Sequence, residues 1–139
     1  MGQYEFLEHT ADIKIRAKGK NFADAMEGAF NAIISIINEK KEKREKEEKL
    51  IIEVREKFLE DVVVNALEKL ITYSEIEKIM PYDVKVISFD EMNNFYSLKA
   101  IVFGYKVNEI ETPIKAVTYH QLVIKEIENE TIIEFIIDI

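Results

Sequence analysis

The chain has 139 residues, a length typical of one globular domain that buries a hydrophobic core without disulfides or a structural metal. It contains no cysteine and only two histidines. These counts exclude disulfides, thiolate zinc sites, iron–sulfur clusters, cysteine nucleophiles and a three-histidine metal site. The net charge of −8 makes the chain a poor stand-alone binder of nucleic acid, and it favours a basic protein partner or a hard cation held by carboxylates.

Targeting and membrane signals are not visible in the sequence. No apolar run approaches the roughly 18 residues of a membrane span. Residues 1–5 lack a basic region followed by an apolar stretch, which a signal peptide would require. We therefore expect a cytoplasmic protein with no membrane partner.

The first half of the chain predicts two strands, a helix, a third strand and a second helix. Apolar residues at 13, 15 and 17 alternate with basic residues at 14, 16 and 18, the period of a half-buried strand. The basic row could attract phosphate or an acidic partner, and the simpler interpretation is a solvent-facing strand side. Asn21 is a good N-cap for a helix whose apolar stripe runs from Phe22 to Ile37, and Asn38 is a plausible end. Residues 39–49 form a charged run, expected to be a solvated loop or a helix extension, before a strand at 50–55 and a helix at 58–74.

The second half of the chain predicts strands only. We expect Pro81 to end the segment after the second helix, followed by strands at 82–89, 95–107, 118–127 and 131–139. Polar residues at 90–94, 108–115 and 128–130 connect them. The order of elements predicts an α+β fold, a single domain over residues 1–139. In this fold, two helices pack on a largely antiparallel sheet and cover one of its faces with their apolar stripes.

Common catalytic and nucleotide-binding motifs are missing from the sequence. It contains no GxGxxG, GxxxxGK[ST], HExxH or GxSxG pattern, and four glycines are too few for a Gly-rich phosphate loop. The first segment that stands out is EHTAD at residues 8–12, which contains His9 and Asp12. Aspartate is unfavourable inside strands, so Asp12 at the head of one indicates a turn or a site. The alternative is an Asx or Ser/Thr turn in which Thr10 and Asp12 cap backbone amides.

Two further segments carry candidate functional residues. The sequence KAVTYH at 115–120 brings Lys115, Tyr119 and His120 together, although the simpler interpretation is a strand start in which the Tyr and His side chains are partly buried and hydrogen-bonded. The apolar C-terminal strand ends on Asp138 and the free carboxylate of Ile139. Two carboxylates one residue apart can ligate Mg²⁺ or Ca²⁺. The alternative is an edge strand whose aspartate is simply solvated.

These three segments together resemble the archease family. YEFLEHTADIKIRAKG at residues 4–19 and the helix at 22–30 are similar to the opening of that family. KAVTYH at 115–120, followed by Leu122, resembles its second signature, and Ile137-Asp138-Ile139 resembles its third. The three motifs occur in family order from one end of the chain to the other.

The resemblance implies a specific function and a specific site. Archeases are partner proteins of the GTP-dependent RNA ligase of tRNA splicing, and they promote its guanylylation and multiple turnover without being ligases themselves. The family's metal site would correspond to Asp12, Asp138 and Ile139, the last through its carboxylate or backbone oxygen. Calcium is the expected ion, with magnesium or another divalent ion as alternatives. His9, Lys115, Tyr119 and His120 would support this site or contact the partner.

Other interpretations stay open at the level of sequence. Within the resemblance, the alternative is a chaperone-like modulator of a tRNA methyltransferase. From other classes, the alternatives are a small metal-dependent hydrolase that uses His9, His120 and the aspartates, an RNA-binding module, and an interaction protein that tolerates loss of Asp12. The acidic net charge argues against the RNA-binding module, and we expect no strong direct binding of nucleic acid.

Overall fold

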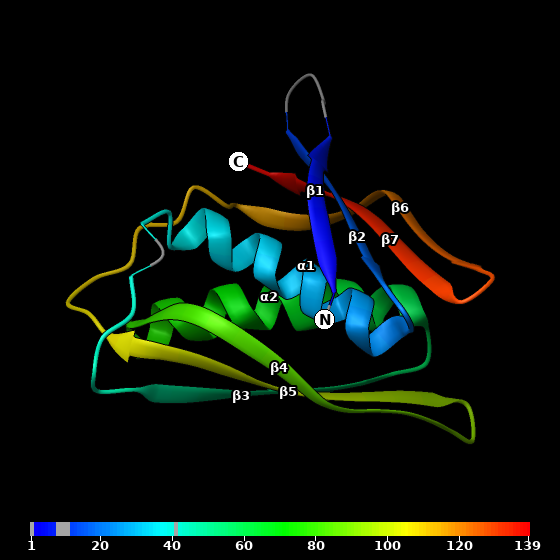
Figure 1. Cartoon of the computed structure of the whole chain (residues 1–139), viewed down its shortest axis with the longest axis horizontal. Coiled ribbons are helices and arrows are strands. Elements are labelled where there is room, and N and C mark those ends of the chain that lie inside the picture. Colours follow the sequence, from blue (N-terminus) through cyan, green and yellow to red (C-terminus); the bar gives the residue numbers. More distant parts are fainter. Residues whose placement is uncertain (1, 8–11, 41) are drawn as a thin grey trace.

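The computed structural model describes residues 2–7, 12–40 and 42–139, which form seven strands and two helices (Figure 1). In chain order these are β1 (Gln3–Leu7), β2 (Ile13–Gly19), α1 (Phe22–Ile37), β3 (Glu48–Glu56), α2 (Leu59–Glu77), β4 (Ile79–Met92), β5 (Phe95–Lys106), β6 (Ala116–Ile127) and β7 (Glu130–Asp138). The predicted elements are therefore all found, with boundaries that differ by a few residues.

The strands form two antiparallel sheets. Sheet A has the order β1-β2-β7-β6, and sheet B has the order β3-β5-β4. Figure 1 shows both helices lying between the two sheets, and α1 indeed contacts β2 in sheet A and β4 in sheet B. The α+β class is confirmed. The arrangement differs from the expected one because the helices fill the space between two sheets and do not cover one face of a single sheet.

Helix α1 begins and ends where the sequence predicts. The side-chain oxygen of Asn21 accepts a 2.8 Å hydrogen bond from the backbone N–H of Asp24, the usual N-cap arrangement. At the other end, the backbone N–H of Asn38 donates to the carbonyl oxygen of Ile34 at 2.8 Å. These bonds satisfy backbone groups that a helix terminus otherwise leaves unpaired.

Helix α1 is buried on more than its predicted stripe. Gly28 and Ala32 are buried in addition to the large apolar residues. A Cβ at Gly28 would lie 2.4 Å from the carbonyl oxygen of Gln3, so only glycine allows β1 to approach the helix this closely. On another side of α1, the ring of Phe22 contacts Phe89 of β4, with centroids 4.5 Å apart. Because α1 is buried on two sides, it packs against sheet A on one side and against sheet B on the other.

Pro81 does not end a segment as expected, because β4 runs through it. β4 is an edge strand of sheet B, and an edge strand tolerates proline because its missing N–H need not pair. The register shifts between Pro81 and Asp83, and the carbonyl oxygen of Pro81 accepts a 3.1 Å hydrogen bond from the Asn38 side chain. The irregular pairing at Pro81 is therefore connected to the end of α1 by this hydrogen bond.

The polar turn predicted between the fourth and fifth strands is confirmed. Asn93 and Asn94 both have positive φ values, 46° and 86°, which is the backbone of a tight hairpin that asparagine tolerates well. The flanking strands extend to Met92 and Phe95, closer to the turn than the sequence pattern indicated. Within the described residues, no helix has the length and apolarity needed to cross a membrane.

Candidate functional site

The two predicted aspartates lie at one end of sheet A, on neighbouring strands. Asp12 directly precedes β2, and Asp138 is the last residue of β7. Ile13 pairs with Ile137, so the next step of the same register places Asp12 opposite Asp138. Positions directly opposite in an antiparallel pair have Cβ atoms about 5 Å apart. Ile139, 41% exposed, continues directly from Asp138 at the same end of the sheet.

Both aspartates occupy positions on the outer face of sheet A. Ile15 and Ala17 of β2 and Ile137 of β7 are buried against the helices, and side chains alternate between the two faces of a strand. The basic row of β2 lies on the same outer face, as the simpler interpretation predicts. Arg16 bridges Glu134 at 2.6 Å and Glu5 at 2.9 Å, and these hydrogen bonds raise the pKa of its guanidinium.

The start of β6 is attached to β7 at this end of the sheet by hydrogen bonds from Lys115 and Thr118, and to helix α2 by one from Val117. The backbone N–H of Lys115 donates to the carbonyl oxygen of Asp138 at 2.7 Å, while the Lys115 residue itself is exposed. The backbone N–H of Val117 donates to a carboxylate oxygen of Glu68 on α2 at 2.6 Å. The hydroxyl of Thr118 donates to the carbonyl oxygen of Ile136 at 3.0 Å. The KAVTYH segment is thus held between β7 and α2.

Past Thr118, β6 forms a large irregularity in its pairing with β7. The register shifts between Thr118 and Val123, and Gln121 has a φ of 55°. The Gln121 side-chain oxygen lies 3.4 Å from the ammonium of Lys14 on β2. Because β7 lies between β6 and β2, this contact passes across the outer face of β7. His120 is exposed, with its Nε2 3.4 Å from the Gln121 amide nitrogen.

Tyr119 is directed toward α2. Its hydroxyl donates a 2.5 Å hydrogen bond to Asp61 in the first turn of that helix. This bond, together with burial and the charges of Asp61 and Glu56, raises the pKa of Tyr119 to about 12. Tyr119 is therefore a neutral donor that anchors the irregular part of β6 to α2, with half of its surface still exposed.

The chemistry of the donor set fits a hard divalent cation. Asp12, Asp138 and the terminal carboxylate of Ile139 supply only oxygen, the donor that Ca²⁺ and Mg²⁺ prefer. The described part of the chain contains no cluster of three or more His, Cys, Asp or Glu side chains that could hold a metal. A cation here would consequently need the chain terminus, a partner group or water among its ligands. His9 lies outside the described residues.

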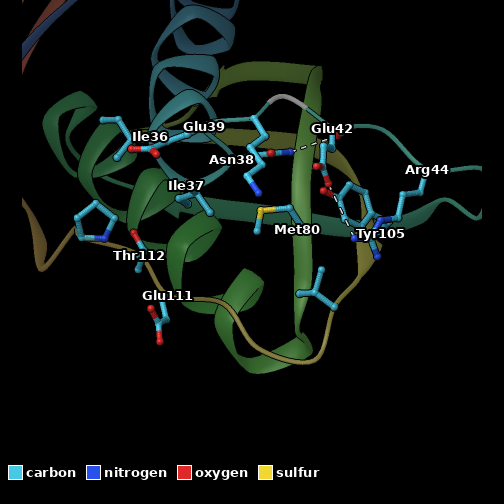
Figure 2. Close-up of a pocket in the computed structure, with 13 residues that line it drawn as sticks. Ile36, Ile37, Asn38, Glu39, Glu42, Arg44, Met80, Tyr105, Glu111 and Thr112 are labelled. Carbon is cyan, nitrogen blue, oxygen red and sulfur yellow. Dashed lines mark hydrogen bonds and ion pairs between the residues drawn. The ribbon is translucent and has the colours of Figure 1, made fainter.

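A separate cavity of about 650 Å³ lies at the C-terminal end of α1 (Figure 2). Asn38, Met80 and Tyr105 line it, and the guanidinium of Arg44 lies 4.5 Å from the Tyr105 ring centroid. Burial and the charge of Glu42 raise the pKa of Tyr105. None of the described candidate residues lines this cavity, although its wall at 111–113 leads into the KAVTYH segment. The candidate site is therefore an open sheet end and not this cavity.

Sequence reasoning missed three side chains that shape the site. Glu68 and Asp61 on α2 hold the backbone and the tyrosine of the KAVTYH segment, and Gln121 connects β6 to Lys14. Acidic residues on a helix usually face solvent, so neither glutamate nor aspartate carried a signal in the sequence. A positive φ at Gln121 also has no sequence signature, since glutamine rarely adopts it.

Comparison with known proteins places these motifs in a family. The family model described as the archease protein family matches residues 4–139. Proteins named archease from Methanosarcina barkeri and Sulfurisphaera tokodaii are each 34% identical to this chain, and the alignments cover 99% and 100% of it and 96% and 100% of those relatives.

Two solved structures share the fold. The solution structure of protein 1598 from Methanobacterium thermoautotrophicum has a TM-score of 0.80 at 21% identity, with 98% of both chains covered. The crystal structure of an archease from Thermotoga maritima, described as a possible chaperone, has a TM-score of 0.56 at 23% identity, with 96% of this chain and 94% of that chain covered. The motifs, the full-length identity and the shared fold lead to one conclusion: this chain belongs to the archease family.

Proposed function

We propose that this protein activates the GTP-dependent RNA ligase of tRNA splicing, through a divalent cation held by Asp12, Asp138 and the C-terminal carboxylate of Ile139. It would promote guanylylation of the ligase and its multiple turnover during exon joining, without catalysing a reaction itself. Calcium is the proposed ion, and magnesium is the main alternative.

The observation that carries the proposal is the register of β2 and β7. The Ile13–Ile137 pair brings Asp12 and Asp138, which lie near opposite ends of the sequence, to one end of one sheet. An open site with few protein ligands leaves positions on the cation for groups of another molecule. A cation shared in this way can orient and neutralise phosphates that a partner enzyme transfers.

The KAVTYH segment supports the same proposal. Its backbone bonds to Asp138 and Glu68 fix the strand beside the carboxylates, and the side chains of Lys115 and His120 remain exposed. Exposed charged and imidazole groups beside an open cation site suit contact with a partner or its phosphates. We propose this role for them, and a role for Tyr119 in positioning the segment.

The decisive experiment measures guanylylation and multiple-turnover joining by the cognate ligase with GTP and a divalent metal. Wild-type protein is compared with the Asp12→Ala and Asp138→Ala variants, and with Glu126→Ala as a matched control from the exposed opposite end of β6. We expect wild type and Glu126→Ala to stimulate the ligase. Asp12→Ala and Asp138→Ala should keep a folded circular dichroism spectrum and lose the stimulation.

Each other outcome has a defined meaning. Stimulation by all four proteins would refute the carboxylate site and keep the ligase role. Stimulation by none would refute the ligase role and favour the alternative of a chaperone-like modulator of a tRNA methyltransferase. The description of the Thermotoga maritima relative as a possible chaperone is the reason to retain that alternative. Turnover of RNA by this protein alone would instead indicate a hydrolase.

A further inference from the structure

The outer face of sheet B carries aromatic rings paired with cations. Phe95 and Phe103 lie on β5, the central strand, and point away from the helices, since the alternate residues Leu98, Ala100 and Val102 are buried. The guanidinium carbon of Arg55 lies 4.5 Å from the Phe95 ring centroid. The ammonium of Lys49 lies 5.7 Å from the ring centroid of Phe103. The face thus presents flat rings with positive groups beside them.

At the Phe95 end this face continues into a hollow of about 650 Å³, lined by Lys57, Phe58, Glu91, Asn94, Phe95 and Tyr96. Three of the six lining side chains are aromatic, and Phe58 is 65% exposed. The ring of Tyr96 is parallel to that of Phe89, with centroids 6.1 Å apart, and both pack against the core on the helix side of the sheet. The hollow therefore combines the exposed Phe58 ring and the Phe95 ring with an amide, an ammonium and a carboxylate group.

The hollow carries charges of both signs. Lys57 and Glu91 both line it, and Arg55 adds a further positive charge at its rim beside Phe95, in a chain whose net charge is −8. Among the described residues, no carboxylate lies within 4.0 Å of either group as an ion pair. Further along the face, Lys99 is 3.7 Å from Glu53 and so is already neutralised. Arg55 and Lys57 therefore stand beside the Phe95 and Phe58 rings without an ion-pair partner among the described carboxylates.

We propose that this hollow and the adjoining outer face of sheet B bind unpaired nucleotides of single-stranded RNA. A base stacks on the exposed ring of Phe58, and a second on the half-buried Phe95 ring with its Arg55 partner, because every base has a π-face that packs on aromatic rings and guanidinium planes. Arg55 and Lys57 neutralise phosphates, and the Asn94 amide hydrogen-bonds a base edge. An acidic peptide would match the cations but would not use the Phe58 and Phe95 rings for stacking, so these two rings favour RNA.

The proposed RNA surface is distinct from the carboxylate site. Figure 1 shows the β4–β5 hairpin, which contributes Asn94 and Phe95, at the opposite corner of the molecule from the C-terminus. The helices separate the outer face of sheet B from sheet A. The inference therefore goes beyond the proposed function and does not depend on it. Binding here should also be weak, because the acidic remainder of the protein repels phosphates.

The test is a fluorescence anisotropy titration of the full-length protein into a labelled 12-nucleotide single-stranded RNA at low salt, with an RNA duplex of equal length for comparison. We expect a dissociation constant on the order of 10⁻⁴ M for the single strand and weaker binding of the duplex. Phe58→Ala should weaken binding roughly tenfold, the usual effect of losing one stacked base. Phe58→Tyr should keep it, because the ring remains.

Two matched controls separate the proposed contacts from general effects. Phe6→Ala removes an aromatic residue that is 50% exposed on the other sheet, and it should leave the affinity unchanged. Arg55→Gln should weaken binding, and it should reduce the slope of log affinity against log salt concentration by about the amount of one phosphate contact. Lys125→Gln on β6 should change neither the affinity nor the slope. Asp12→Ala should also bind RNA normally, so a failure of the carboxylate site and a failure of this proposal remain distinguishable.

Several results would overturn the inference. The wild-type protein could fail to bind the single strand at low salt, or bind the duplex equally well. Phe58→Ala could bind as tightly as wild type, or Phe6→Ala could lose as much affinity. Displacement of the RNA by a polyglutamate peptide at equal charge concentration would show a surface for acidic proteins in its place.

Discussion

The hydrogen bond between Glu68 and Val117 offers a direct test of how α2 supports the candidate site. The carboxylate of Glu68 accepts the backbone N–H of Val117 at 2.6 Å, and Val117 is only 5% exposed. In Glu68→Ala this N–H would be left buried without an acceptor. Leaving a buried donor unsatisfied costs about 1–3 kcal/mol, and we expect a loss of about 2 kcal/mol in the free energy of unfolding.

The matched control is Glu68→Gln, which keeps an acceptor oxygen of the same reach and removes only the charge. We expect it to lose less than about 1 kcal/mol, because a neutral hydrogen bond is weaker than a charge-assisted one. For a chain of this size, the loss of about 2 kcal/mol in Glu68→Ala corresponds to a fall in Tm of roughly 6–10 °C. Both variants are measured by thermal and urea unfolding followed by circular dichroism.

The same change should reach the candidate cation site. Val117 is two residues from Lys115, whose backbone bonds Asp138, so release of this strand should also loosen the carboxylate. We expect Glu68→Ala to bind Ca²⁺ more weakly than Glu68→Gln in calorimetric titrations. Equal stability of the two variants, or unchanged stability relative to wild type, would refute the account of Glu68 as the acceptor for this strand.

Three further predictions concern other groups. Burial, and secondarily the charge of Asp24, raises the pKa of the Glu27 carboxyl in the folded protein. The contribution of Glu27 to folding stability is therefore greatest below its pKa in the unfolded chain, and it falls as pH rises through its pKa in the folded protein. Glu27→Gln should therefore raise Tm at pH 7, with the gain vanishing near pH 4 in a calorimetric pH series. Tyr119→Phe should lower the free energy of unfolding by about 1 kcal/mol, because the hydrogen bond to the partly exposed Asp61 is lost. The wild-type protein should lose stability as pH rises from about 10 toward the Tyr119 pKa of about 12, and Tyr119→Phe should abolish this loss in urea unfolding. A C-terminal extension beyond Ile139 should impair Ca²⁺ binding in calorimetry, and unchanged affinity would show that the terminus is not a ligand.

Local structure was predictable wherever the chain signals it within a few residues. Asn21 and Asn38 mark the ends of α1, and the alternation from Ile13 to Lys18 marks β2, because caps and period-2 burial are local properties. The polar turn at Asn93 and Asn94 is similarly local. The α+β class follows from the order of such elements.

The division into two sheets was not predictable from the same signals. Alternation shows which side of a strand is buried, but it does not show which strands pair. β5 pairs with both β3 and β4, so it lies between them in space although it follows both in sequence. The one available signal was in α1, where Gly28 and Ala32 lie off the large apolar stripe and are nevertheless buried. Small residues on a second helix face indicate a close neighbour there, and that neighbour is β1 for Gly28.

The candidate site depends on the same core packing that holds the sheets together. Ile133, Phe135 and Ile137 of β7 are fully buried, and they fix which residues of this strand face the helices. A slip of one residue would turn all three outward and would turn Asp138 inward, since side chains alternate. Burying three large apolar side chains is worth several kcal/mol, more than the contacts of a single half-buried aspartate. The position of Asp138 beside Asp12 is therefore determined by apolar residues that take no part in binding. Substitutions of Ile133, Phe135 or Ile137 should disturb the placement of the two carboxylates as strongly as substitutions of the aspartates themselves.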